Sequence, residues 1–285
     1  MMPKIAFFGT PAIGVYVLEE LERAGIVPSL IVTNPDTQQG RKMRMTETLV
    51  AQFARKRGIT TLKPKTLNDS TTLEALRASG VELFIVAAYG KIIPNAILNL
   101  PKHGTLNMHP SLLPKLRGAS RIRSAILQNE YPTGVSIMVL TEGLDKGPIV
   151  AQEVVSIEKS AWPLSGRILD EHLARAGGAL LARILPEWIH GNITPQEQDD
   201  TEATYSSKIT KGMAEIDLEE DALENLRKIR AFDGWPGAFF FHEKDGVRTR
   251  VKILDAVLRD NALVLTRVIP EGKKEMAYED WIRNT

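Results

Sequence analysis

The sequence predicts an α/β fold with a mainly parallel sheet, followed by a small β domain. Short apolar runs alternate with segments of helical apolar spacing over the first two thirds of the chain, which is typical of a doubly wound sheet. After about residue 205, short alternating segments with turn signals favour a small barrel. The length of 285 residues agrees with about two domains.

Apolar runs that end at turn residues predict the strands of the first domain. We expect these strands at residues 3–8, 29–33, 59–62, 82–88, 104–109, 134–140 and 148–157. Helical apolar spacing predicts connecting helices at residues 12–25, 47–57, 71–79, 119–129 and 163–190. Thr10 can cap the first of these helices, and Pro11 suits its first turn.

A change of composition predicts the domain boundaries. Residues 191–204 are polar and acidic and contain a proline, which is typical of a linker. We therefore expect a first domain at 1–190 and a second at 205–285. In the second domain we expect a helix at 223–231, and Asp245-Gly246 indicates a hairpin turn.

The composition excludes several classes of protein. The chain has no cysteine, which excludes a disulfide framework, a thiolate metal site and a cysteine nucleophile. The formal net charge of +1 argues against a globally basic nucleic-acid coat protein. The sequence has no apolar run of about 18 residues and no signal-peptide pattern, so we expect no membrane span and a cytoplasmic location.

Three polar residues lie at the end of a predicted strand or in the loop after one. Asn107 and His109 are two apart on an expected strand and so share one face. Asp145 lies in the next strand-to-strand loop, and ligands of open α/β sheets bind beyond the strands' carboxyl ends. An amide and an imidazole suit oxyanion stabilisation and proton transfer. Each residue alone also fits a structural role, so the spacing leaves the function open.

Other motifs are absent or uninformative. There is no GxSxG nucleophile elbow, so acyl transfer would proceed by direct attack of the acceptor. The segment from Gly9 to Gly14 is neither GxGxxG nor a P-loop and indicates a plain strand-to-helix turn. The five histidines show no metal-ligand spacing, and we expect no metal site.

Positive charge gathers in two segments of a nearly neutral chain. Residues 38–57 carry six basic residues and one acidic residue, and residues 244–274 carry eight and four. A phosphate-backbone partner would explain this segregation, and so would a solvated surface. The pattern alone does not decide between the two.

The segment NMHPSLLPKLRGA at 107–119, with GLDKG at 143–147, resembles the folate-dependent formyltransferases. The similarity extends over nearly the whole chain, through KIAFFGTP near the start to IRAFDGWPGAFF and PEGKKEM in the second domain. It implies a Rossmann-like formyltransferase domain followed by an OB-like barrel. That barrel would be shortened between Leu258 and Leu263.

The resemblance implies a donor, an acceptor and a set of site residues. The donor would be 10-formyltetrahydrofolate and the acceptor the methionine α-amine of charged initiator tRNA. Separately, no apolar stripe is left over for an interface, so we expect a monomer. Asn107, His109 and Asp145 match the family's catalytic residues. The folate-contacting positions match Tyr89, Gly90, Ile92, Ser111, Leu112, Leu113, Pro114, Leu140 and Gly143. The tRNA-contacting positions match Arg41, Lys42, Arg44, Lys273 and Lys274.

Departures from the family pattern keep other functions open. Arg121 and Arg123 stand where the family usually has proline and glutamine, which would place two cations near the mouth of the site. The alternatives are a sugar-nucleotide amine formyltransferase, a formyltetrahydrofolate hydrolase and a non-catalytic tRNA-binding protein. An NAD oxidoreductase is poorly supported because its glycine fingerprint is missing.

Overall fold

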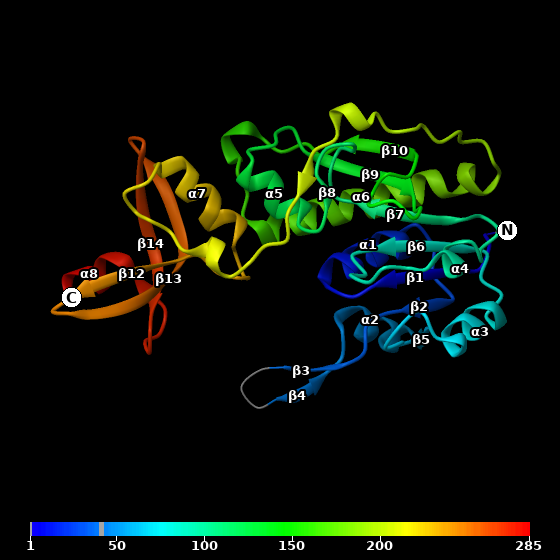
Figure 1. The fold of residues 1–285 in the computed structure, drawn as a ribbon, viewed down its shortest axis with the longest axis horizontal. Coiled ribbons are helices and arrows are strands. Elements are labelled where there is room, and N and C mark those ends of the chain that lie inside the picture. Colours follow the sequence, from blue (N-terminus) through cyan, green and yellow to red (C-terminus); the bar gives the residue numbers. More distant parts are fainter. Residues whose placement is uncertain (1, 40–42) are drawn as a thin grey trace. The chain divides into compact units, whose positions relative to one another are not determined.

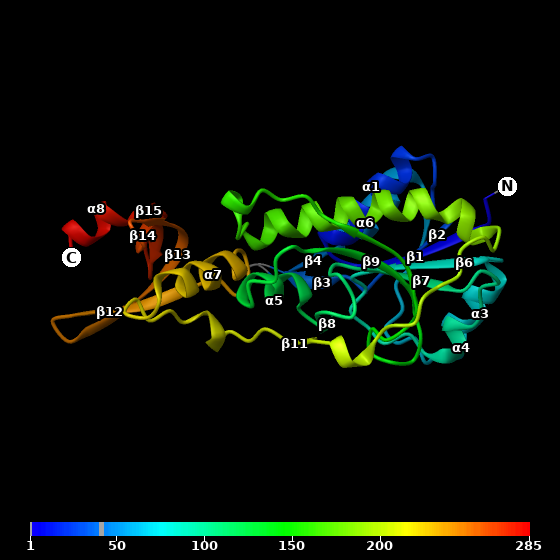
Figure 2. The same cartoon turned by 90° about the horizontal axis from the view of Figure 1, so that it is seen from above.

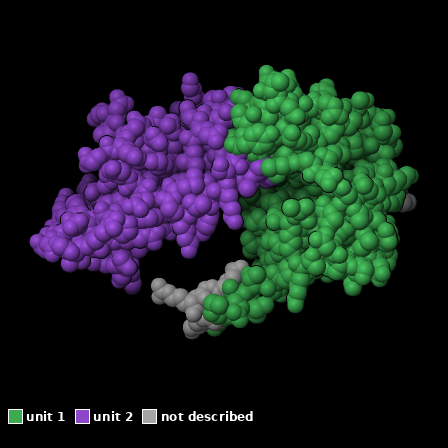
Figure 3. All heavy atoms as spheres, viewed as in Figure 1, with its two compact units in different colours: residues 1–117, 133–155, 171–205 green, residues 118–132, 156–170, 206–285 purple. Residues whose placement is uncertain are grey.

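The computed structural model describes residues 2–39 and 43–285, and Figure 1 shows its elements. The chain divides into two compact units (Figure 3). The first unit comprises residues 1–117, 133–155 and 171–205, and the second comprises residues 118–132, 156–170 and 206–285. The sequence domains 1–190 and 205–285 stay a prediction. In the described part of the chain, no helix has the length and apolar character needed to cross a bilayer.

The first unit contains a seven-stranded sheet that includes all seven predicted strands. In spatial order these are β10 (Ile149–Val154), β9 (Gly134–Val139), β7 (Thr105–His109), β6 (Leu83–Ala87), β1 (Ile5–Gly9), β2 (Leu30–Val32) and β5 (Thr60–Leu62). The five from β7 to β5 are parallel, whereas β9 runs antiparallel to β7 and β10 antiparallel to β9. The prediction of a mainly parallel α/β sheet is confirmed.

Helices cover both faces of this sheet, as a parallel sheet requires. They are α1 (Ala12–Arg23), α2 (Leu49–Arg57), α3 (Ser70–Ala78), α4 (Asn95–Leu98) and α6 (Gly166–Ile189). In Figure 2, α1 and α6 lie on one face of the sheet and α3 and α4 on the other. Leu76 of α3 and Ile97 of α4 pack with Phe8 and Phe84 in one buried core cluster.

Helix α6 approaches β7 closely through a glycine. A Cβ atom on Gly177 would lie 2.5 Å from Cγ of Met108, the residue between Asn107 and His109. Gly178 approaches α1 in the same way, with its Cβ position 3.0 Å from the Val17 carbonyl oxygen. These two glycines let α6 pack directly behind the strand that carries the candidate site.

The predicted Thr10 cap is wrong. Pro11 is the N-cap residue of α1, and no side chain caps that end. Thr10 Oγ1 instead donates to the Tyr89 carbonyl oxygen at 3.2 Å. Its hydroxyl joins the segments that follow β1 and β6, so it is not available to the helix.

The structure adds an exposed hairpin that the sequence did not reveal. Strand β3 (Thr37–Gln39) pairs with β4 (Arg44–Thr46) in antiparallel register. Lys63 Nζ lies 2.7 Å from Asp36 Oδ1 and 3.4 Å from Glu47 Oε1, so one ammonium group joins the two ends of the hairpin. These contacts raise the pKa of Lys63, chiefly through the hydrogen bond to Asp36.

The second unit holds the predicted small antiparallel β domain. Its sheet has the order β12 (Phe239–Lys244), β13 (Val247–Arg259), β14 (Ala262–Pro270) and β15 (Met276–Ala277). Its helices are α5 (Arg121–Leu127), α7 (Ala222–Ala231) and α8 (Tyr278–Arg283). In the described residues no pairing joins β15 to β12, so the sheet remains open. The remaining short elements are β8 (Arg117–Gly118), β11 (Tyr205–Ser206), and the 3₁₀ turns at Lys159–Ala161, Asp200–Glu202 and Gly212–Ala214.

Two tight turns connect the long strands of this sheet. Asp245 and Gly246 both have positive φ, 52° and 73°, and form the predicted hairpin turn. Asp260 and Asn261 have φ of 50° and 62° and connect β13 to β14 directly. The segment that is short in sequence is therefore a two-residue turn, which asparagine and aspartate tolerate better than most residues.

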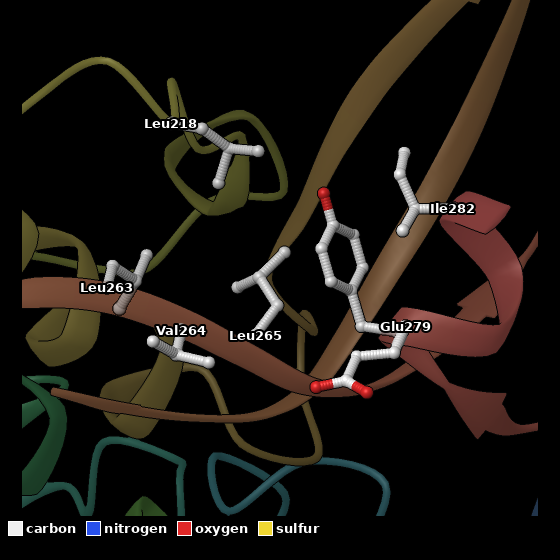
Figure 4. Close-up of a pocket in the computed structure, with 7 residues that line it drawn as sticks. Leu218, Leu263, Val264, Leu265, Glu279 and Ile282 are labelled. Carbon is white, nitrogen blue, oxygen red and sulfur yellow. The ribbon is translucent and has the colours of Figure 1, made fainter. Parts of the chain in front are cut away.

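A small apolar cavity lies between β14 and α8 (Figure 4). Its volume is ≈ 300 Å³, and Leu263, Leu265, Tyr278 and Ile282 are among its lining residues. Burial raises the pKa of the Tyr278 phenol. Helix α8 thus covers the first residues of β14 and leaves this cavity between them.

Candidate active site

Strand β7 carries Asn107 and His109 at its carboxyl end. Asn107 is paired with Val86 of β6 and Met138 of β9, and His109 is paired with Ser136 of β9. Because the two residues are two apart on a strand, their side chains leave the same face. Asn107 is 7% exposed and His109 is completely buried.

Both ring nitrogens of His109 face hydrogen-bond acceptors. Nε2 lies 3.2 Å from the Leu116 carbonyl oxygen, and Nδ1 lies 3.5 Å from Asp145 Oδ1. A carbonyl oxygen can only accept, so Nε2 carries the proton of that hydrogen bond. The Asp145 carboxylate lies beside the other ring nitrogen, Nδ1.

Asp145 lies in a turn that requires glycine at position 147. Asp145 has φ of 50° and is 6% exposed. A Cβ atom on Gly147 would lie 1.8 Å from the Val139 carbonyl oxygen, so only glycine fits where the chain returns past β9. The turn connects β9 to β10 and places the Asp145 carboxylate beside His109 of β7.

Two residues that the sequence reasoning missed support this turn. Gln198 Nε2 donates to the carbonyl oxygens of Asp145 and Gly147, at 2.9 and 2.7 Å. Gln198 Oε1 accepts from Nε and Nη2 of the buried Arg117, at 3.0 and 2.8 Å. Arg117 lies inside the recognised motif, but Gln198 lies in the polar segment predicted as a linker and carries no sequence signal.

Arg117 is also held by an acidic partner. Its Nη1 lies 2.6 Å from Asp200 Oδ1. The hydrogen bond from the guanidinium lowers the pKa of the Asp200 carboxyl. A completely buried arginine needs such partners because desolvating its charge is costly.

The loop after β7 is fixed by two polar side chains. Ser136 Oγ donates to the Ser111 carbonyl oxygen at 2.6 Å and accepts from the Leu113 N–H at 3.0 Å. Gln152 Nε2 donates to the Leu113 carbonyl oxygen at 2.7 Å. Ser111 and Leu113 are buried, whereas Leu112 and Pro114 are half-buried.

The other expected folate contacts lie in different surroundings. The Tyr89 ring packs edge-on against Phe8 in the core, and burial raises the pKa of its phenol to about 12. Ile92 is 91% exposed, and Gly90 and Gly143 are exposed as well. Leu140 packs against the core cluster that contains Tyr89.

In the described residues no group of three or more histidine or carboxylate side chains gathers as a metal site.

The expected tRNA contacts belong to both units. Arg41 and Lys42 lie outside the described residues. Arg44 is exposed on β4, and Lys273 and Lys274 are exposed between β14 and β15. The position of Arg121 and Arg123 near the site mouth stays a prediction. Within the second unit, the Arg123 guanidinium binds Asp170 through two hydrogen bonds of 2.6 and 2.8 Å.

Comparison with known proteins shows the family. Residues 3–173 match the formyl transferase family, and residues 208–262 match the formyl transferase C-terminal domain. The chain is 39% identical to the methionyl-tRNA formyltransferase of Thermus thermophilus, over 98% of this chain and 95% of that protein. It is 35% identical to the methionyl-tRNA formyltransferase of Bacillus licheniformis, over 99% of this chain and 95% of that protein.

Solved structures share the fold at lower identity. The methionyl-tRNA formyltransferase of Clostridium thermocellum has a TM-score of 0.60 at 18% identity, over 95% of this chain and 99% of that chain. The N-formyltransferase of Helicobacter canadensis, in complex with folinic acid and dTDP-3-aminofucose, has a TM-score of 0.66 at 20% identity, over 97% and 99%. The match to both formyl transferase domains, and to relatives along nearly the whole chain, places this chain in the methionyl-tRNA formyltransferase family of formyl-transferring enzymes.

Proposed function

We propose that this enzyme transfers the formyl group of 10-formyltetrahydrofolate to the α-amine of methionine on charged initiator tRNA. The observation that carries the proposal is the contact of His109 with Asp145, beside Asn107 at the end of β7. The identity to relatives that bear this name supports the choice of acceptor.

The three polar side chains have complementary roles in the proposed reaction. The amine nitrogen bonds to the formyl carbon, and the bond from that carbon to N10 of the folate breaks. Asn107 donates to the oxyanion that forms, and the positive charge of His109 stabilises it at short range. Asp145 accepts the proton that the amine loses, and N10 of the departing folate takes up a proton.

The loop that follows β7 suits the donor side of the site. Residues 111–114 are held by Ser136 and Gln152, so their backbone is preorganised for a flat ligand. We place the folate ring between this loop and the segments around Gly90, Ile92 and 140–143. Tyr89 would act there through its backbone, because its ring lies in the core.

The basic residues suit an RNA acceptor. Arg44, Lys273 and Lys274 are exposed, and with Arg41 and Lys42 they would contact phosphates. In the second unit, the Arg250 guanidinium lies 3.8 Å from the ring centroid of Phe239, and that of Arg248 lies 3.7 Å from the ring centroid of Phe241. Arg248 and Arg250 are exposed, so they add positive charge that suits a phosphate backbone.

A single assay tests both the donor and the acceptor. The purified enzyme receives 10-formyltetrahydrofolate with either charged initiator tRNA or an amino-sugar nucleotide. Formylation of the tRNA is the expected result. Formylation of the sugar alone would overturn this proposal. The enzyme would then be a sugar-nucleotide amine formyltransferase, like the structurally similar enzyme of Helicobacter canadensis.

The catalytic role of His109 has a direct test. We expect His109→Ala to lower turnover by about 10²- to 10³-fold, because the oxyanion loses its nearest positive charge. Folate affinity should change little. His172→Ala, which alters an exposed histidine of α6, is the matched control. Turnover of His109→Ala within a few fold of the control would remove His109 from the mechanism.

A further inference from the structure

We propose that Gln198 is a positioning residue that holds the Asp145 carboxylate against His109. The inference rests on the proposed catalytic roles of those two residues. Gln198 lies 53 residues beyond Asp145, and its Nε2 bonds to the backbone of the turn, not to the carboxylate or the imidazole. It would act through the backbone of the turn that carries Asp145.

The Gln198 carboxamide bridges the two sides of that turn. Both protons of Nε2 are used, one on the Asp145 carbonyl oxygen and one on the Gly147 carbonyl oxygen. Since Asp145 has a positive φ, its backbone conformation is unfavourable for a residue with a side chain. External hydrogen bonds on both carbonyl groups offset that strain and fix the direction of the side chain.

Arg117 fixes the orientation of the carboxamide itself. Two of its N–H groups donate to Gln198 Oε1, so rotating the amide by 180° would direct the Nε2 protons at a cation. The Arg117 side chain is in turn fixed by Asp200. The amide therefore has one satisfied orientation, in which its nitrogen faces the turn.

The same segment of chain holds the other neighbour of His109. The Leu116 N–H donates to Thr204 Oγ1 at 2.9 Å, and the Arg117 N–H donates to the Thr204 carbonyl oxygen at 2.9 Å. Leu116 is the residue whose carbonyl oxygen accepts from His109 Nε2. Residues 198–204 thus fix both polar neighbours of the imidazole, Asp145 through Gln198 and Leu116 through Thr204.

The decisive variant is Gln198→Met, which keeps the length of the side chain and removes its donors and its acceptor. We expect turnover to fall about 10- to 100-fold, because a small displacement of a catalytic group has effects of this size. The KM for the folate donor should stay within about twofold of the wild type. Gln196→Met is the control, since Gln196 is exposed and its backbone alone bridges to Ile149.

A measurement on the unliganded protein separates positioning from general damage. Ring ¹⁵N chemical shifts report the protonation and tautomer of each histidine. We expect Gln198→Met to shift the His109 ring signals and to leave those of His103, His172, His190 and His242 in place. A loss of turnover without any change at His109 would overturn the proposal, and so would wild-type turnover.

A second variant tests the positioning role of Gln198 if Gln198→Met does not fold. Gln198→Glu keeps an acceptor for Arg117 and removes both donors to the turn. We expect it to fold, to shift the His109 signals and to lose turnover, and wild-type behaviour in both would overturn the proposal. If the wild type formylates no tRNA, the proposed function fails, while the histidine signals still test the positioning role.

Discussion

At the scale of the residue, the main feature of the candidate site is the pair of oxygen atoms that face the His109 ring. His109 lies between the Leu116 carbonyl oxygen and the Asp145 carboxylate, so each ring nitrogen faces an oxygen that can accept. The sequence predicted Asn107, His109 and Asp145 because they lie in two short segments, 107–119 and 143–147, that resemble the formyltransferases. It did not predict Gln198, because a glutamine that bonds to backbone groups leaves no pattern in a polar segment.

Tyr89 offers a residue-scale prediction about pH. Its hydroxyl is buried and has no hydrogen-bond partner in the described part of the chain. Burial raises the pKa of this phenol from 10.0 to about 12. Its contribution to stability is therefore complete below pH 10 and is lost as the pH rises from about 10 through about 12.

We expect Tyr89→Phe to be as stable as the wild type at neutral pH, or more stable, since it removes an unpaired polar group. Between pH 10 and 12 the wild type should lose stability relative to the variant, by about 1.4 kcal/mol per unit of pKa difference. Denaturant unfolding at a series of pH values measures this. A constant difference across that range would contradict the raised pKa.

At the scale of the element, burial explains which segments the sequence predicted. The strands β1, β6 and β7 are fully buried along their length, and continuous apolar runs reveal β1 and β6. The hairpin of β3 and β4 is exposed and polar, so its residues carry no hydrophobic pattern. Helices α4 and α8, with four and six residues, are too short to show a helical period.

Helix α2 gives an element-scale prediction about capping. Thr48 Oγ1 accepts from the Ala51 N–H at 3.1 Å and lies 2.8 Å from Oγ1 of the buried Thr33. We expect Thr48→Ala to cost about 1 kcal/mol or more, because it removes the cap and leaves a buried hydroxyl unpaired. Thr48→Ser keeps the oxygen and should stay near wild-type stability. Equal denaturation midpoints for the two variants would exclude the capping role.

At the scale of the whole molecule, a net charge of +1 conceals a segregation of charge along the chain. The order of elements was predictable, since alternating strands and helices specify a parallel sheet and later alternation specifies an antiparallel one. The open sheet of the second unit agrees with the shortened barrel that the family resemblance implies. The turn at Asp260-Asn261 shows how the shorter chain is accommodated.

Salt dependence provides the prediction at this scale. We expect the double variant Lys273→Ala with Lys274→Ala to bind charged initiator tRNA more weakly. The slope of log affinity against log salt should fall by about 2, since each lost phosphate contact changes it by about 1. Lys102→Ala, an exposed lysine of the first unit, is the control. An unchanged slope in the double variant would remove these lysines from the RNA interface.

The close approach of α6 to β7 makes the candidate site sensitive to changes on the other face of the sheet. Met108 leaves the opposite face of its strand from Asn107 and His109, toward a helix that comes close because Gly177 has no side chain. A single added methyl group there must push on the residue that separates Asn107 from His109. Substitutions at the contact between α6 and β7 are therefore expected to disturb Asn107 and His109, although they touch neither residue.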